Sequence, residues 1–323
     1  MSHDLNLPQM ADDPAAIAET AEEFGYGGVW LGELWGASSV VKLSEIATRT
    51  EEIGIGTAIL NVYSRSPAVL AMTAATLDDV SGGRFTLGVG TSTPKAVEDL
   101  HSMSFDRPVR RSHETIDLVK QFLAGEGRID YDGEVYETAD FPALGVHVDV
   151  YHAALGRANR RVVARLADGW IPHNVPFPDL PEAFDYIVDH TPEDREVDDI
   201  SVAPYVPAAV SEDAEEARDA VRGHVAYYVG SGDGYRRTVA RRFPEGADRV
   251  AELWRDGERE DATDAVTDEM VEALGVAGTA ADARDQFEEI ASMDVVDRPM
   301  VTVPNNATDL AEETVAALAP SEF

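Results

Sequence analysis

The segment from residue 54 to residue 92 constrains the fold of this chain more than any other part of its sequence. Residues 53–60 are apolar and rich in β-branched side chains, which is typical of a parallel strand that is covered on both faces. Residues 67–81 follow with a helical pattern that begins at a proline and ends at a glycine pair. Residues 85–89 form a second apolar run, so the segment predicts a strand, a helix and a parallel strand.

Polar residues and a glycine follow the two predicted strands of this unit. Asn61 and Tyr63 come after the first strand, and Gly90, Thr91 and Ser92 come after the second. The carboxyl ends of parallel strands meet at one edge of a sheet or barrel, and ligands bind at that edge. We therefore expect these residues to border an active site.

The alternation of strand and helix patterns continues along the whole chain. We expect eight strands, at residues 5–9, 28–34, 53–60, 85–89, 148–155, 170–172, 201–210 and 300–303. A longer section after the fourth strand contains a predicted hairpin that turns at Asp132-Gly133, and residues 232–275 interrupt the pattern before the eighth strand. The sequence thus predicts an α/β fold, a TIM (β/α)8 barrel with insertions after strand 4 and before strand 8. Since no Pro-, Gly- or Ser-rich linker divides the chain, we expect residues 1–323 to form a single domain.

The charge of the chain is strongly negative, because 61 acidic residues stand against 26 basic ones and the formal net charge is −35. The acidic residues are spread over almost every amphipathic segment, which is typical of a halophilic protein that works in molar salt. Such a chain is not expected to bind nucleic acid or an anionic membrane, since both need basic patches. No run of 18 apolar residues and no signal peptide is present, so we expect a cytoplasmic protein.

The sequence lacks the residues that several kinds of chemistry require. The chain has no cysteine, which excludes disulfides, thiolate metal sites and a cysteine nucleophile. The paired His and Asp patterns of metal sites, the nucleophile elbow and the Walker motif are absent as well, so no metal is expected. The two glycines at 88 and 90 lack the third glycine of a dinucleotide fingerprint.

Four segments in a fixed order carry a family resemblance. They are AEEFGYGGVWLGE (21–33), the unit at 54–92 with SGGRFTLGVGTS, ALGRANRRVVARLADGWIPHN (154–174) and the segment 278–304. Together they resemble the bacterial luciferase-like flavin and deazaflavin oxidoreductases over roughly residues 12–304. The stretch GTAILNVYSRSPAVLA (56–71) is similar to the branch that uses coenzyme F420, an 8-hydroxy-5-deazaflavin, such as methylenetetrahydromethanopterin reductase.

The resemblance implies where a cofactor binds. It places the ring of F420, or of FMN as the alternative, across the barrel mouth against the end of the third strand. A non-proline cis peptide is common there in the family, and in this chain it is expected at Ala58-Ile59 or Ile59-Leu60. The cofactor phosphate needs amides and hydroxyls, preferably at helix amino ends. The predicted cofactor-binding residues are Ala58, Ile59, Leu60, Asn61, Gly90, Thr91, Ser92, Leu155, Gly156 and Arg157.

The same resemblance directs attention to a few candidate catalytic residues. Glu33 ends the second strand, where a carboxylate can orient the substrate or donate a proton if burial raises its pKa. His173 and Tyr63 also follow strands and are candidates for contacts with ring or substrate, as is His152. The alternative interpretation is that Glu33 is a rim charge and that the histidines are packed in the core.

The chain departs from the family pattern at three positions of the mouth. Leu34 stands where a histidine commonly follows the acid, Gln9 lies near a usual glutamate, and Thr91 takes the place of another acid. These departures count against a reaction on a methylene-pterin more than they count against binding of the cofactor.

Three functions follow as expectations. The first is an F420-dependent oxidoreductase that transfers a hydride to or from a small organic substrate, either a methylene-pterin or an alcohol or aldehyde. The second is an FMN-dependent luciferase-like monooxygenase. The third is a non-catalytic barrel that binds a flavin or pterin. We expect a small-molecule substrate, a homodimer or higher homo-oligomer, and neither nucleic acid nor a membrane as a partner.

Overall fold

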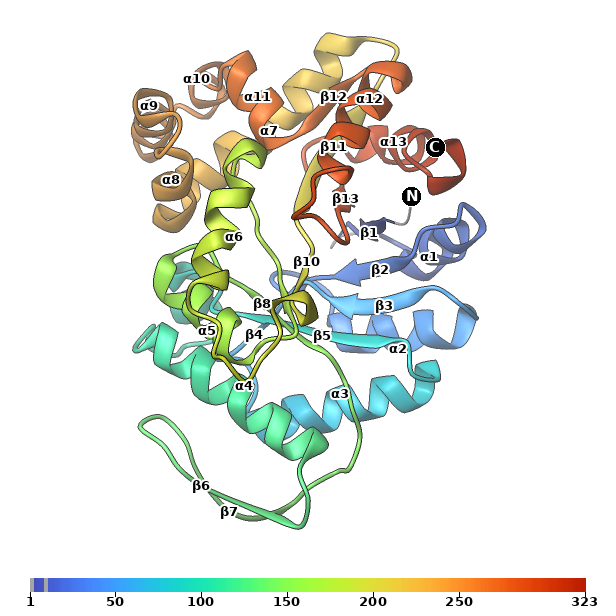
Figure 1. Ribbon diagram of the computed structural model, residues 1–323. Helices are drawn as coiled ribbons and strands as arrows, with labels where there is room; N and C mark the ends of the chain where they lie inside the picture. The colour runs from blue at the N-terminus through green and yellow to red at the C-terminus, as the bar shows by residue number, and fades with distance from the viewer. Residues whose placement is uncertain (1–2, 9–10) are drawn as a thin grey trace.

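A curled, mostly parallel sheet forms the centre of the computed structural model, which describes residues 3–8 and 11–323 (Figure 1). Its strands are β1 (Asp4–Asn6), β2 (Gly28–Leu31), β3 (Gly54–Thr57), β5 (Phe85–Gly90), β8 (Val150–Ala153), β9 (Gly169–Trp170), β10 (Ser201–Val202), β11 (Tyr205–Val210) and β13 (Met300–Thr302). Two short strands join them, since β4 (Leu60–Asn61) pairs with β5 and β12 (Val276–Gly278) pairs with β11.

The segment 201–210 joins the two ends of this sheet. The strand order is β10-β9-β8-β5-β3-β2-β1-β13-β11-β12, with β10 bonded to β9 and β11 bonded to β13. Only Ala203 and Pro204 separate β10 from β11. The Ala203 amide donates to Trp170 O at 2.9 Å, and the Met300 amide donates to Pro204 O at 2.8 Å. The predicted TIM barrel is confirmed, with 201–210 as its seventh strand.

Helices cover the outside of the barrel, as Figure 1 shows. Those that follow the strands are α1 (Pro14–Glu23), α2 (Ser39–Arg49), α3 (Pro67–Ser81), α4 (Pro108–Ala124), α5 (Arg157–Leu166), α6 (Leu180–Val188), α7 (Ala214–Ser231), α12 (Ala280–Ala291) and α13 (Ala311–Ala317). The helix α3 shows how local signals set such bounds. Pro67 begins it, the Ser66 hydroxyl accepts from the Val69 amide at 3.4 Å, and Gly82 ends it with a φ of 70°.

Both predicted insertions are present. The first follows β5 and contains a π-helix at Ala96–Leu100 and the hairpin β6 (Arg128–Asp132) and β7 (Glu137–Pro142), which lies beyond α4 in Figure 1. The second precedes β13 and consists of α8 (Asp233–Val239), α9 (Pro244–Asp256), α10 (Arg259–Asp264) and α11 (Asp268–Leu274). These four helices pack beside α7 and so reach the carboxyl end of the barrel.

Large side chains fill the barrel from its amino end. Trp30, Tyr151 and Met300 pack together inside the barrel, and the Trp30 indole donates to Asp4 Oδ2 at 2.7 Å. The room for Trp30 comes from Gly56, because a Cβ atom at that position would lie 2.4 Å from the indole. With the amino end closed in this way, the free space of the barrel is at the carboxyl ends of the strands.

Some strand bounds differ from the prediction. The first strand ends at Asn6 and the sixth ends at Trp170, and one further amide after each strand still bonds to the neighbouring strand, since Leu7 donates to Trp30 O at 2.8 Å and Ile171 donates to His152 O at 3.1 Å. Gln9, which was compared with a glutamate of the family, lies outside the described residues. Within the described part of the chain, no helix combines the length and the apolar character needed to cross a membrane.

Candidate functional site

A cavity of about 680 Å³ opens at the carboxyl ends of the strands, and we call it the mouth cavity. Strand ends contribute Asn6, Glu33, Ala58, Ile59, Ser92, His173 and Thr302 to its lining, while the second insertion and α7 contribute His224, Tyr228, Tyr235 and Trp254. The volume and the mainly apolar and aromatic walls are typical of a site for a small molecule. The mouth cavity therefore lies where the sequence predicted the active site.

The turn after β3 forms one wall of the mouth cavity. The peptide bond between Ala58 and Ile59 is cis, at the first of the two expected positions. The Ala58 carbonyl accepts a hydrogen bond from the Tyr205 hydroxyl at 2.6 Å. A Cβ atom at Gly90 would lie 3.2 Å from the Ile59 side chain, so the small residue allows Ile59 to pack against β5.

Leu60 and Asn61, which were predicted to bind the cofactor, lie behind this wall. Both are buried and belong to β4, and neither lines the mouth cavity. The Asn61 side-chain oxygen accepts from the Tyr63 amide at 2.7 Å, which turns the chain away from the barrel axis. The Asn61 amide nitrogen makes no hydrogen bond with a described residue.

Tyr63 is consequently directed away from the mouth cavity. Its hydroxyl donates to Asp106 O at 3.0 Å, its ring stacks on Phe105, and the Arg111 guanidinium lies 4.7 Å from the ring centre. The first insertion thus encloses the side chain. The structure does not bring Tyr63 together with Glu33 or His173.

Glu33 does line the mouth cavity, but other residues of the chain hold its carboxylate. Arg65 Nη2 lies 2.8 Å from one carboxylate oxygen and 3.0 Å from the other. The Ser39 hydroxyl and amide donate to Oε2 at 3.0 and 3.2 Å. A carboxylate that accepts four hydrogen bonds in this way is arranged as an acceptor and an anchor for Arg65, not as a proton donor.

His173 forms a buried pair with His224 of α7. The two Nε2 atoms are 3.2 Å apart, so one ring donates and the other accepts. Burial is the main cause that holds the pKa of His173 well below its ordinary value, and the neighbouring His224 lowers it further. Burial also lowers the pKa of His224 to about 3. Both imidazoles are therefore neutral near pH 7.

Aromatic residues surround this histidine pair. The His173 ring stacks on Tyr205 with centroids 4.4 Å apart, and the Tyr228 ring meets it edge-on at 4.3 Å. Burial raises the pKa of Tyr235 to about 12 and that of Tyr228 well above its usual value, so both hydroxyls stay protonated. Neither hydroxyl donates to a described residue, and both side chains line the mouth cavity. They are available as donors to a ligand.

His152 lies outside the mouth cavity. It is fully buried on β8, and its Nδ1 atom lies 3.2 Å from Val89 O. Burial lowers its pKa to about 4. This agrees with the interpretation that His152 is a core residue.

The residues predicted to hold the cofactor phosphate divide between two places. Ser92 lines the mouth cavity with a φ of 57°, and the Thr91 side chain lies next to it without lining the cavity. Leu155, Gly156 and Arg157 instead line a second cavity, of about 710 Å³, at the amino end of α5. The two sets therefore do not surround one common point.

The sequence analysis missed the residues that α7 and the second insertion contribute to the mouth. His224 and Tyr228 lie in α7 and Tyr235 lies in α8, and their contact with the mouth cavity depends on tertiary packing that the sequence pattern does not show. The aromatic pair Tyr227-Tyr228 within an otherwise acidic helix was the available signal. Within residues 3–8 and 11–323, no three histidine, aspartate or glutamate side chains are grouped so as to hold a metal ion.

Comparison with known proteins places this fold and site in context. The sequence model of the family described as luciferase-like monooxygenase matches residues 3–296. Over 307 residues the chain is 29% identical to a 5,10-methylenetetrahydromethanopterin reductase of Methanopyrus kandleri, covering 86% of each protein.

Two solved structures share the fold. A coenzyme F420-dependent tetrahydromethanopterin reductase from Methanopyrus kandleri matches with a TM-score of 0.83 and 22% identity, over 99% of this chain and 97% of the other. An F420-dependent secondary alcohol dehydrogenase in complex with an F420-acetone adduct matches with a TM-score of 0.74 and 16% identity, over 98% of both chains.

Proposed function

Because this chain belongs to the luciferase-like monooxygenase family, we propose that it is a coenzyme F420-dependent oxidoreductase that acts on a small organic substrate. Membership of this family makes the protein an enzyme and leaves open which cofactor and which substrate it uses. The relatives described above whose names include F420 or a methanopterin reductase support the choice of F420. The observation that carries the proposal is the mouth cavity, where an apolar wall and a neutral histidine pair face one ligand-sized space.

The residues of the mouth cavity fit a flat ring with polar edges. Ala58 and Ile59 provide an apolar wall, and aromatic side chains stand on the side of α7 and α8. Polar groups are available at the edge, since the buried Asn6 side-chain oxygen has no hydrogen-bond partner among the described residues. When bound, the deazaflavin accepts or donates a hydride; the protein supplies binding, orientation and proton transfer.

The histidine pair is the group of the mouth cavity best placed to move a proton. Glu33 is the one acid among the described residues that line the cavity, and Arg65 and Ser39 occupy its oxygens. A neutral imidazole accepts a proton and leaves the donor hydroxyls of Tyr228 and Tyr235 to orient the substrate. This arrangement favours an alcohol, whose hydroxyl loses its proton to His173 as its carbon gives up a hydride, over a methylene-pterin.

An FMN-dependent monooxygenase is the second candidate, because the family description itself names that reaction. Oxygen uptake distinguishes the monooxygenase from the F420-dependent oxidoreductase. The reduced form of each cofactor is mixed with the protein in molar KCl, and oxygen uptake is recorded beside the reoxidation of the cofactor. We expect no oxygen uptake above that of the free cofactors, and reoxidation of reduced F420 by aldehydes or ketones. Oxygen uptake that requires both the protein and reduced FMN would establish the monooxygenase instead.

Further assignments stay predictions. They include a single domain over residues 1–323, a homo-oligomer, a cytoplasmic location and a halophilic source. Binding of the cofactor by the predicted residues also stays a prediction, with Ala58, Ile59 and Ser92 at the mouth and Gly156 and Arg157 at α5.

A further inference from the structure

Basic residues outnumber acidic ones in the lining of the mouth cavity. Arg255 lies near the end of α9 and Arg259 begins α10, and both line the cavity, as does Lys95 of the first insertion. Glu33 is the one acidic residue in this lining among the described residues. Such an excess of positive charge is unexpected in a chain with 61 acidic and 26 basic residues.

Two of these four charged side chains already have a partner of opposite charge. Glu33 is paired with Arg65 at 2.8 Å. Lys95 lies 2.7 Å from Asp99, one turn further along the chain. The other two, Arg255 and Arg259, make no ion pair with any carboxylate of residues 3–8 and 11–323. The charge that remains uncompensated in the mouth cavity is therefore that of two arginines of the second insertion.

Trp254 holds the Arg259 side chain in place at this wall. The Arg259 guanidinium lies 3.9 Å from the centre of the indole ring, and its Nη1 donates to Trp254 O. A guanidinium over an indole face is a favourable contact that leaves the edge of the guanidinium free. The remaining N–H groups of Arg259 donate to no described residue, so they are available to a ligand.

The position of Trp254 depends in turn on Gly230 of α7. A Cβ atom at Gly230 would lie 2.1 Å from Trp254 Cγ, so the indole packs this close to the helix because a glycine stands there. Tyr227 of the same helix meets the Trp254 ring edge-on, with centroids 5.8 Å apart. The helix α7 thus supports the indole that carries Arg259.

Arg259 and the histidine pair line different parts of the same cavity. Ring centroids of Tyr228 and His173 are 4.3 Å apart, those of Tyr228 and Tyr227 are 5.1 Å apart, and Tyr227 contacts Trp254. Two tyrosine rings and the indole thus lie along the path of contacts from His173 to Arg259. A group held by Arg259 and a carbon that reacts beside His173 therefore belong to different ends of one molecule.

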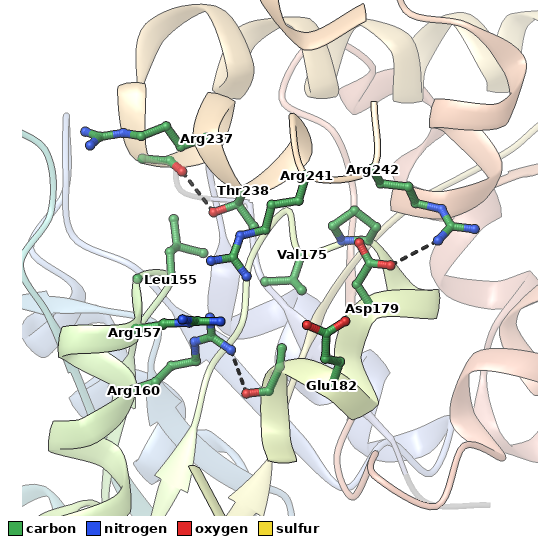
Figure 2. A pocket seen from close by; sticks show the side chains of 14 residues that line it. Leu155, Arg157, Arg160, Val175, Asp179, Glu182, Arg237, Thr238, Arg241 and Arg242 are labelled. Carbon is green, nitrogen blue, oxygen red and sulfur yellow. Dashed lines mark hydrogen bonds and ion pairs between the residues drawn. The ribbon is translucent and has the colours of Figure 1, made fainter. Parts of the chain in front are cut away.

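These two arginines are distinct from those of the second cavity. Figure 2 shows the side chains of that cavity, which include Arg157 and Arg241, and neither Arg255 nor Arg259 lines it. An anion bound by Arg259 is therefore separate from a cofactor phosphate at Gly156 and Arg157, where one is predicted.

We propose that the substrate carries an oxyanion, a carboxylate or phosphate group, at the end remote from the reacting carbon, and that Arg259 and Arg255 bind this group. Arginine suits both groups, because its planar fork donates two parallel hydrogen bonds to carboxylate or phosphate oxygens. Direct contacts of this kind are screened less than long-range attraction in molar salt, where the screening length is about 3 Å. The proposal deepens the proposed function and rests on it for the reaction, whereas binding of the anion can be measured without F420.

The test compares three aldehydes of equal chain length, namely hexanal, 6-oxohexanoate and 6-oxohexyl phosphate. Each turnover adds a hydride from reduced F420 and a proton to the aldehyde, and leaves an alcohol and oxidised F420. Reoxidation of F420 is followed in molar KCl for the unmodified protein, Arg259→Gln and Arg249→Gln.

Arg249→Gln is the control for the loss of one positive charge. Arg249 is exposed on α9, pairs with Glu252 and does not line the mouth cavity. Arg259 is exposed as well, so both variants are expected to fold, which circular dichroism checks.

We expect kcat/KM to be about 10-fold higher for at least one anionic aldehyde than for hexanal. Arg259→Gln is expected to reduce this preference about 10-fold, while Arg249→Gln keeps it. The anionic aldehyde with the larger preference identifies the group as a carboxylate or a phosphate. The proposal is overturned if neither anionic aldehyde is preferred over hexanal, or if Arg259→Gln keeps the preference as fully as Arg249→Gln does.

Failure of the proposed function gives a different result. Adipate, which has no aldehyde group, is titrated calorimetrically into the same three proteins without F420. If no aldehyde reoxidises reduced F420 but adipate binds, and Arg259→Gln weakens that binding about 10-fold, the anion site is retained and only the assignment of the reaction is lost. If no aldehyde reacts and adipate does not bind, the anion site is overturned as well.

Discussion

Replacing Glu33 by glutamine distinguishes an anchoring carboxylate from a proton donor. Glu33→Gln preserves the shape of the side chain and removes its charge. The side chains of Glu33 and Arg65 are 21% and 19% exposed, and their closest atoms are 2.8 Å apart. The substitution leaves a mostly buried guanidinium without its counter-charge and places an NH₂ group near it or near Ser39.

The magnitude follows from the hydrogen bonds that are lost. Charge-assisted bonds contribute about 1.5–3 kcal/mol each, and a partly buried group without its partner costs about 1–3 kcal/mol. We expect Glu33→Gln to lower the free energy of unfolding by about 1–3 kcal/mol. The double variant Glu33→Gln, Arg65→Gln is expected to lose less than the sum of the single variants, with a coupling of about 1–2 kcal/mol.

Urea unfolding in molar KCl measures the free energy of unfolding of the unmodified protein, the two single variants and the double variant. Steady-state kinetics on the same proteins measures turnover. Since hydrogen bonds from Arg65 and Ser39 occupy both carboxylate oxygens, we expect Glu33→Gln to lower kcat less than 10-fold and Arg65→Gln to lower it similarly. Loss of a proton donor would instead lower kcat about 10²–10⁴-fold. A loss of that size in Glu33→Gln alone, with no coupling to Arg65, would refute the reasoning.

Two further predictions concern the buried histidines. His173→Asn and His224→Asn are each expected to lower kcat about 10²-fold or more and to change F420 affinity less than 3-fold, because the proposed function assigns proton transfer, and not cofactor binding, to this pair. Fluorescence titration and kinetics on the same variants check this, and unchanged kcat in both would contradict it. The second prediction concerns the stability of the fold at acid pH. Burial lowers the pKa values of His3 and His152 to about 4, so between pH 6.5 and 4 the unfolded chain binds protons that the folded chain does not. Stability therefore falls as the pH falls through this range, by about 1.4 kcal/mol per unit for each histidine. His152→Gln is expected to reduce the difference in unfolding free energy between pH 6 and pH 5 by about 1 kcal/mol in urea titrations, and a slope equal to that of the unmodified protein would be the contrary result.

The parts of the fold that depend on local signals could be predicted from the sequence. Pro67 and Gly82 mark the ends of α3 because a proline at the first turn and a glycine with positive φ act within a few residues. The strand at 276–278 was missed, because a run of three residues directly after a helix has no period of its own and pairs only through the distant β11.

The candidate site could likewise be predicted where it depends on local signals and not where it depends on contacts between distant residues. The position of Glu33 and His173 at the mouth cavity could be predicted because each lies just past a buried strand, and strand ends border the mouth. The direction of Tyr63 could not be predicted, since it depends on the Asn61 turn and on contacts with Phe105. Neither could the second cavity, because Arg160 and Arg241 are far apart in sequence and line it together only in the folded chain.

Competition between F420 and FMN for the mouth cavity tests the central claim most directly. The protein, in molar KCl, is titrated with each cofactor alone and then with one in the presence of the other, and binding is followed by fluorescence. Binding of F420 in the mouth cavity with His173 at its edge predicts a Kd at least about 10-fold lower for F420 and full displacement of FMN by it. Tighter binding of FMN, with F420 unable to displace it, would contradict the assignment of this protein as an F420-dependent enzyme.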